Sequence, residues 1–240
     1  MQQLSYFELV GFGPNGWGWA LLTATAMTLA VALCGFLVGS VIGTLIAWAK
    51  LSRSVAARWM ADGYTTVLRG IPDLLVIYLF YFGGSAALSA IGSLFGAEGF
   101  IGVPAFVTGA LAIGIVSGAY QAEVFRGAYQ VVSRGELEAA RSVGMHRWLM
   151  FRRIIAPQVL RYAIPGLGNT WQLVLKESAL ISVTGLVELL RQSHIAAGST
   201  RRPFDFYLTA GGLYLLITRG SPHLFQRAET HSMRGMRRAS

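Results

Sequence analysis

The sequence predicts an all-α integral membrane protein of about five transmembrane helices, with its N-terminus outside and its C-terminus in the cytoplasm. Of its 240 residues, 54% are hydrophobic and 13% are charged, whereas soluble domains carry about 25% charged residues. Its mean hydropathy is +0.52, and its apolar runs are too long for one soluble core. Lysine and arginine are also distributed unevenly among the connections between these runs.

The long apolar runs give the expected helices, because a membrane span needs roughly 20 residues. No charged residue lies between Glu8 and Lys50, and Trp17 and Trp19 stand where an interfacial aromatic belt is expected. A second apolar run follows Asp73, and its helix is expected to end near the glycine pair at 83–84. The expected helices cover 19–48, about 63 to 84, 102–121, 163–187 and a short fifth segment, 204–218.

The basic residues orient these helices. Sixteen of the lysines and arginines fall in the connections 50–69 and 122–161 and in the tail that follows residue 218. The opposite connections hold three, namely Arg191, Arg201 and Arg202, which fit the topology least well. Because connections rich in lysine and arginine stay in the cytoplasm, the N-terminus is expected outside and the C-terminus inside. Termini on opposite sides require an odd number of spans. We therefore expect a periplasmic N-terminal segment, 1–18, a transmembrane domain, 19–218, which includes the cytoplasmic loop 122–161, and a basic cytoplasmic tail, 219–240.

Glycines recur at four-residue spacing in two of the expected helices. Such rows put small residues on one helix face and let two backbones approach closely in lipid. Packing within the bundle explains them, and an interface between subunits is the alternative. The rows are Gly35, Gly39 and Gly43 in the first helix, and Gly114 and Gly118 in the third.

The polar stretch 136–157 predicts a helical elbow beneath the membrane. Ala139, Ala140 and Val143 share one helix face, and Trp148, Phe151 and Ile155 share another. Gly144 lies between the two halves, where a left-handed turn ends the first helix. Pro157 is expected to end the second half. The elbow suits docking into a groove of a soluble partner; an amphipathic loop lying on lipid headgroups is the alternative.

This stretch resembles the EAA loop of ABC importer permeases. The matching residues are Glu138, Ala139, Ala140, Gly144, Ile154 and Pro157, and Ala156 stands where the family has leucine. The segments Arg69-Gly70-Ile71-Pro72, Gly118-Ala119-Tyr120-Gln121-Ala122-Glu123 and Leu175-Lys176-Glu177-Ser178-Ala179-Leu180 resemble the polar amino acid subgroup, closest to the histidine, basic amino acid and opine permeases. The resemblance covers roughly residues 15 to 218. Arg219-Gly220-Ser221-Pro222-His223 departs from the apolar residues usual in the family.

The resemblance implies a type I, MetI-like permease subunit that translocates polar amino acids across the bacterial inner membrane. It implies a homologous second permease subunit or a second copy, two cytoplasmic ABC ATPases, and a periplasmic amino acid- or opine-binding protein. In that family the EAA elbow is the coupling helix, which converts ATPase closure into gating. This chain has no phosphate-binding Gly-x-x-x-x-Gly-Lys-Ser/Thr loop. ATP and Mg²⁺ are therefore expected on the partner ATPase, with no cofactor on this chain.

The charges Lys176 and Glu177 fall within the fourth expected span. Each charge at mid-bilayer costs about 2.5–3.5 kcal/mol, so both are candidates, with Gln172, to line the translocation path. A structural role against neighbouring helices is the alternative. The candidate structural or gating residues are Arg69, Pro72, Asp73, Gln121 and Glu123.

Other classes of function are less consistent with the sequence. A proton-coupled secondary transporter using Glu177 or Asp73 is the main competitor, and the absence of an internal repeat weighs against it. A membrane-embedded enzyme lacks a Ser/His/Asp set and paired carboxylates, and His194 and His223 have no second metal ligand at useful spacing. Nucleic-acid binding is excluded because the arginines form no single stripe. Cys34 lies in an apolar run and is expected to be a buried small side chain.

Overall fold

The computed structural model describes residues 5–94, 99, 102–221 and, further on, 223, 225, 227, 229 and 230. The elements within these ranges are all helical, which confirms the all-α class. They are α1 (Tyr6–Val10), α2 (Gly18–Lys50), α3 (Val55–Gly70), α4 (Asp73–Tyr78), the π-helical η1 (Leu79–Gly83), α5 (Gly84–Leu94), α6 (Ala105–Gln130), α7 (Arg134–Ser142), α8 (Arg147–Met150), the π-helical η2 (Phe151–Ile155), α9 (Ala156–Glu177), the 3₁₀-helical η3 (Ser178–Thr184), α10 (Leu189–Thr200) and α11 (Pro203–Gly220).

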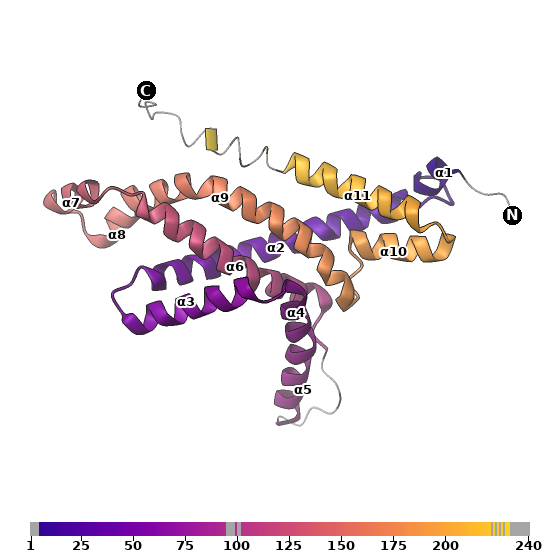
Figure 1. Cartoon of the computed structure of the whole chain (residues 1–240), viewed down its shortest axis with the longest axis horizontal. Helices are drawn as coiled ribbons and strands as arrows, with labels where there is room; N and C mark the ends of the chain where they lie inside the picture. The colour runs from indigo at the N-terminus through magenta and orange to yellow at the C-terminus, as the bar shows by residue number, and fades with distance from the viewer. Residues whose placement is uncertain are drawn as a thin grey trace.

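The centre of the molecule is the pair α2 and α6, which run side by side in the same direction (Figure 1). A Cβ added at Gly43 would stand 3.0 Å from the Ala122 nitrogen and 3.1 Å from the Gly118 carbonyl oxygen. Gly35 and Gly39 likewise face the α6 backbone. The first glycine row therefore packs within the bundle, and only glycine permits this approach.

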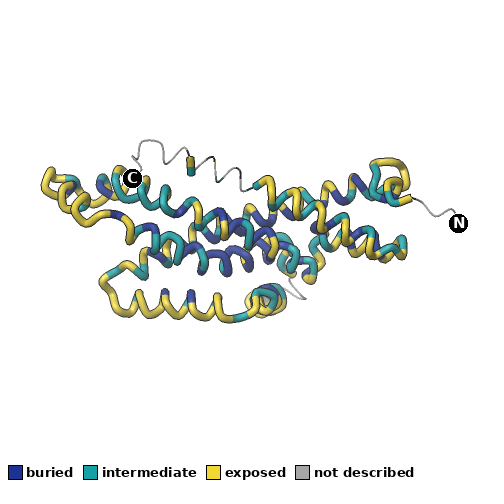
Figure 2. The backbone as a smooth tube through the Cα atoms, turned by 45° about the horizontal axis from the view of Figure 1, so that its top comes forward, coloured by how far each residue is buried: buried dark blue, intermediate teal, exposed yellow. Residues whose placement is uncertain are grey.

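Helix α9 runs antiparallel to this pair and completes the main core (Figure 1). Phe36 of α2 and Trp171 of α9 meet edge to face, with ring centroids 5.5 Å apart. Ile113 of α6, Ile77 of α4 and Ile181 of η3 belong to the same cluster. Figure 2 shows buried residues gathered along α2, α6 and α9, while α3 and the α4–α5 arm are largely exposed.

The second expected helix was wrong at both ends. No helix runs from Gly63 into the apolar run, because α3 ends at Gly70 and a new helix begins at Asp73. Pro72 disfavours the helical conformation in the preceding residue, and Ile71 is extended, with φ −103° and ψ 151°. The glycine pair at 83–84 does not end the helix either; it lies within the continuous run α4–η1–α5.

Two further boundaries differ from expectation. The third helix continues nine residues beyond 121, to Gln130, because partners neutralise its charged residue Glu123. The fourth begins earlier and its α-helical part ends at Glu177, after which the chain tightens into η3 and turns at Gly185 (φ +88°). Lys176 and Glu177 therefore lie at the end of the α-helix, where it changes into η3, and their depth in the membrane stays a prediction. The first and fifth expected helices match α2 and α11 closely.

Three described helices are long and apolar enough to cross a membrane: α2, the 73–91 run and α6. Helices α9 and α11 occupy the places of the fourth and fifth expected spans, with 22 and 18 residues. The number five and the orientation stay predictions. The stretch that begins at Arg219 departs from the apolar residues usual in the family. There α11 extends to Gly220, and Phe225 beyond it contacts Phe36 and Trp171. Arg234, Arg237 and Arg238 lie outside the described residues.

Candidate functional site

The elbow formed by α7 and α8 protrudes from one end of the molecule, opposite the α10–α11 end (Figure 1). Gly144 has φ +77° at the junction, which confirms the predicted left-handed turn. The amide of Met145 donates to the carbonyl of Ala140 (3.0 Å), which closes α7. His146 then caps α8, its Nδ1 accepting a hydrogen bond from the Leu149 amide. Two short helices thus meet at a fixed angle.

The elbow presents a mixed surface. Glu138 and Ala139 are exposed, while Ala140 is buried. Val143 is exposed, and Trp148, 65% exposed, stacks on Phe151 with ring centroids 5.7 Å apart. Such an apolar surface at a tip of a polar loop is suited to a protein partner.

A single helical run connects the elbow to the middle of the molecule, because α8, η2 and α9 follow one another without a break from Arg147 to Glu177. The prediction that Pro157 ends the elbow was wrong. The π-helical turn η2 just before Pro157 absorbs its missing N–H, so the helix continues. Ile154 is half-buried in this turn, and Gln158 donates to the Glu136 carboxylate, which ties α7 to α9.

Glu177 ends this run, buried, and neither of its carboxylate oxygens has a hydrogen-bond partner among the described residues. Asp73, at the first turn of α4, lies close enough to act on it by charge. Lys176 is exposed instead, and Gln172 is half-buried one turn earlier. The structure therefore brings Asp73 to Glu177 and separates Lys176 from them. Two acidic side chains thus lie close together, one of them buried, without a basic side chain between them among the described residues.

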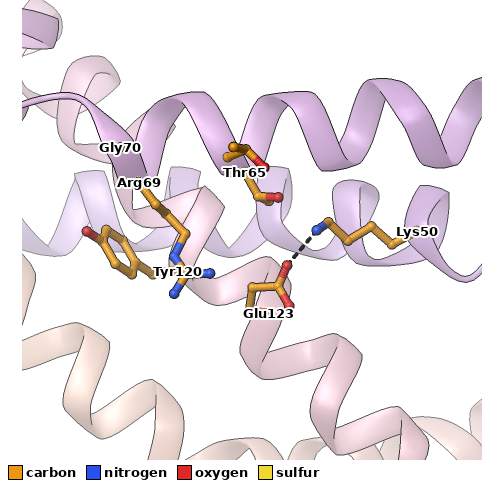
Figure 3. Close-up of a pocket in the computed structure, with 7 residues that line it drawn as sticks. Lys50, Thr65, Arg69, Gly70, Tyr120 and Glu123 are labelled. Atoms are coloured by element: carbon orange, nitrogen blue, oxygen red, sulfur yellow. Dashed lines mark hydrogen bonds and ion pairs between the residues drawn. The ribbon is translucent and has the colours of Figure 1, made fainter.

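Beside these carboxylates, α2, α3 and α6 enclose a pocket of about 520 Å³. The Arg69 guanidinium lies over the Tyr120 ring, 5.4 Å from its centroid (Figure 3). Tyr120 is also within electrostatic range of Asp73 and Glu177. One basic and two acidic side chains thus lie near this aromatic ring. Pro72 directly precedes Asp73 and fixes the chain break from which both Arg69 and Asp73 project.

An ion-pair network closes the far side of this pocket. The Lys50 ammonium group contacts Glu123 at 2.5 Å and Asp62 at 2.9 Å, and Arg126 contacts Glu123 at 2.8 Å. The hydrogen bond from Lys50 and its charge lower the pKa of the exposed Asp62 carboxyl. Glu123 is therefore a structural clamp joining α2 and α6.

Gln121 makes a second clamp between the same helices. Its side chain is fully buried, accepts from the Ser40 hydroxyl (2.7 Å) and donates to the Phe36 carbonyl (3.1 Å). A buried amide with both ends bonded holds two helices in register. The geometry thus favours a structural role for Gln121.

Sequence reasoning missed Lys50, Tyr120 and Glu188. Lys50 was counted as a cytoplasmic charge and Tyr120 as part of a motif. Glu188 is fully buried and caps α10, accepting from the amides of Leu190 (2.9 Å) and Arg191 (2.8 Å) and from Tyr214 (3.0 Å). An acidic residue just before an apolar-periodic segment is a helix-start signal, and it was available in the sequence.

Known relatives are similar to the chain over nearly its whole length. It is 62% identical to the octopine transport system permease protein of Rhizobium radiobacter, covering 98% of this chain and 99% of the relative. It is 48% identical to the nopaline transport system permease protein of Agrobacterium fabrum (strain C58 / ATCC 33970), covering 95% and 98%. It is 36% identical to the histidine/lysine/arginine/ornithine transport system permease protein of Escherichia coli (strain K12), covering 93% and 98%.

Solved structures agree with these relatives. A chain from the crystal structure of an amino acid ABC transporter with histidines matches with a TM-score of 0.77 and 31% identity, over 96% of this chain and 100% of that one. A chain of the inward-facing MetNI methionine ABC transporter matches with a TM-score of 0.68 at 16% identity, over 91% and 98%, and shares the fold.

The family model described as the binding-protein-dependent transport system inner membrane component matches residues 35–227. This range includes the elbow, the helical run to Glu177 and the pocket beside Tyr120. The resemblance seen in the sequence is therefore confirmed, and the chain belongs to this family, as a permease subunit of an ABC importer of the polar amino acid group and not an enzyme.

Proposed function

We propose that this chain is half of a translocation channel in a bacterial inner membrane and that it carries opines such as octopine, with basic amino acids as related cargo. Its second half is a homologous subunit or a second copy. Two ATPases dock on the cytoplasmic side, where ATP and Mg²⁺ bind, and this chain carries no cofactor. A periplasmic binding protein delivers the cargo on the other side. Relatives that transport octopine and nopaline support this choice of cargo.

In this proposal the elbow, residues 136–157, is the ATPase contact. Glu138 and Ala139 present its exposed small and acidic surface, and Gly144 sets the angle between its halves. Ala140, Ile154 and Pro157 connect it to the bundle. ATPase movement at the elbow then tilts the helical run that ends at Glu177.

The observation that carries the proposal is this continuous helical run, because it joins the exposed elbow to the buried Glu177 carboxylate beside Asp73. Opines derived from arginine combine a guanidinium group with carboxylates. Glu177 and Asp73 suit the guanidinium group, and Arg69 suits a carboxylate. Lys176 and Gln172 complete the candidate path, and Lys176 is exposed and so available to the second subunit.

The test is octopine uptake by the complete transporter in proteoliposomes. Glu177→Gln keeps the size of the side chain and removes its charge, so we expect initial uptake to fall at least about tenfold while binding-protein-stimulated ATPase activity persists. Glu8→Gln, the same change on the exposed α1, should leave uptake unchanged. Native uptake by Glu177→Gln contradicts the path, and uptake driven by an ion gradient without ATP contradicts the function.

A further inference from the structure

The three arginines that fit the charge topology least well lie together at the α10–α11 end of the molecule. Arg202 is compensated locally, since its Nε lies 2.6 Å from the Asp205 carboxylate. Arg191 and Arg201 are exposed, and neither forms an ion pair with any described residue. This end, opposite the elbow in Figure 1, thus presents two exposed guanidinium groups that have no ion-pair partner among the described residues, although the carboxylate of Glu8 in α1 lies at the same end.

Arg191 belongs to a pocket at this end, with a volume of about 250 Å³. Its walls come from η3, α10 and α11, and its lining residues are Ser182, Val183, Leu190, Arg191, His194 and Tyr207. His194 Nδ1 and the Tyr207 hydroxyl are 2.8 Å apart, which joins α10 to α11. The lining provides a guanidinium group, hydroxyls and an imidazole but no carboxylate, so its chemistry suits a carboxylate ligand.

The pocket stands on a rigid base. Below it, the buried Glu188 accepts the amides of Leu190 and Arg191 and the Tyr214 hydroxyl, and the Leu189 amide donates to Thr28 Oγ1 of α2 (3.0 Å). The start of α10 is therefore attached to both α2 and α11. A fixed backbone at Arg191 reduces the entropy lost when a ligand binds there.

The pocket also adjoins the translocation path. Ser182 and Val183 belong to η3, which continues directly from Glu177. A group bound in the pocket therefore contacts the segment that holds the buried carboxylate in place. Binding on this side can thus influence the path without entering it.

We propose that this pocket receives a carboxylate side chain from the binding protein that docks on the periplasmic face. The inference rests on the proposed function and on the predicted orientation, and the family description itself names a binding-protein-dependent system. A protein carboxylate is preferred because a pocket of about 250 Å³ has room for one such side chain, and because its lining offers a guanidinium group and no competing carboxylate.

The experiment measures ATPase activity of the complete transporter in nanodiscs at increasing concentrations of the substrate-loaded binding protein. Arg191→Glu should raise the half-maximal concentration at least about tenfold, with basal activity and maximal stimulation unchanged. Arg201→Glu makes the same charge change on the same end but outside the pocket. At about 150 mM salt, where exposed charges act over about 8 Å, it should change that concentration less than about twofold.

A charge swap makes the test independent of folding. Acidic residues of the binding protein are changed to lysine one at a time, and one of them should restore docking to Arg191→Glu while weakening docking to the wild type. An unchanged half-maximal concentration in Arg191→Glu overturns the inference. So does an equal effect of Arg201→Glu, a dependence on anionic lipid in place of binding protein, or a defect seen only in uptake at saturating binding protein. Failure of the wild type to be stimulated at all rejects the proposed function instead.

Discussion

The α2–α6 pair and the elbow both depend on glycine, but for different physical reasons. At Gly43 the helix conformation is ordinary and the α6 backbone leaves no room for a Cβ. At Gly144 there is open space around the residue, and the backbone conformation is the constraint, with φ +77°. The first glycine lies in a static frame and the second in an exposed joint.

This difference separates two kinds of damage. A substitution at Gly43 in the α2–α6 pair disrupts the packing of these two long helices and reduces the amount of folded protein. A substitution in the joint leaves the core intact and changes the angle between α7 and α8 in the elbow, the proposed ATPase contact. Measuring protein amount and transport together distinguishes them.

The largest effect on transport is expected at the joint. In Gly144→Val a β-branched residue is forced into a left-handed conformation, so α7 and α8 change their relative angle. Uptake should fall at least about tenfold with normal membrane levels, and the ATPase should fail to co-purify. Gly144→Asn tolerates the same φ and should keep most of the activity. Equal activity in both variants would refute the role of this turn.

The frame should respond with lost stability. In Gly43→Ala the new Cβ meets α6 backbone atoms that cannot move separately, and overpacking of this kind costs about 1–3 kcal/mol. The melting temperature of the purified complex should fall, with transport per folded molecule near normal. Gly63→Ala, with nothing within 4 Å of the added Cβ, is the matched control and should not lower it. Similar melting of the two variants would contradict the close α2–α6 contact.

The smallest effect is expected at the exposed end of the ion-pair network. Lys50 lowers the pKa of Asp62, so Asp62 stabilises the fold while ionised, above its unfolded pKa of about 3.9. That contribution is lost as pH falls through the lower folded value. Asp62→Asn should lower the melting temperature slightly at pH 7, less than Gly43→Ala does, and high salt should reduce the difference. A difference that disappears between pH 7 and pH 5 would assign it to another group.

The sequence predicted the helices best where apolar length decides the structure, as in α2 and α11. It failed where a local rule competed with length: Pro72 divided what looked like one helix, and the glycines at 83–84 did not end one, because a membrane helix tolerates them. In the elbow the turn at Gly144 was predicted correctly, since its φ follows from local chemistry, but the continuation of the helix through Pro157 was not.

The site was harder to predict because its contacts join distant segments. Glu177 was a candidate from its charge alone, but its proximity to Asp73 depends on how α4 meets the end of α9. Lys50 and Glu123 are 73 residues apart in the chain. Such pairings require the packing of α2 on α6. The glycine spacing suggests that two helices pack closely, but it does not tell which residues of the two helices lie opposite each other.

The continuous helical run from the elbow to Glu177 can transmit movement from one end of the molecule to its middle. At 1.5 Å per residue it is about 45 Å long, so a tilt of about 5° at one end displaces the other by about 4 Å. That displacement is comparable to the width of a guanidinium group. In the proposed function, a modest rotation of the elbow by the ATPase would be enough to change which side of the membrane the buried Glu177 carboxylate faces.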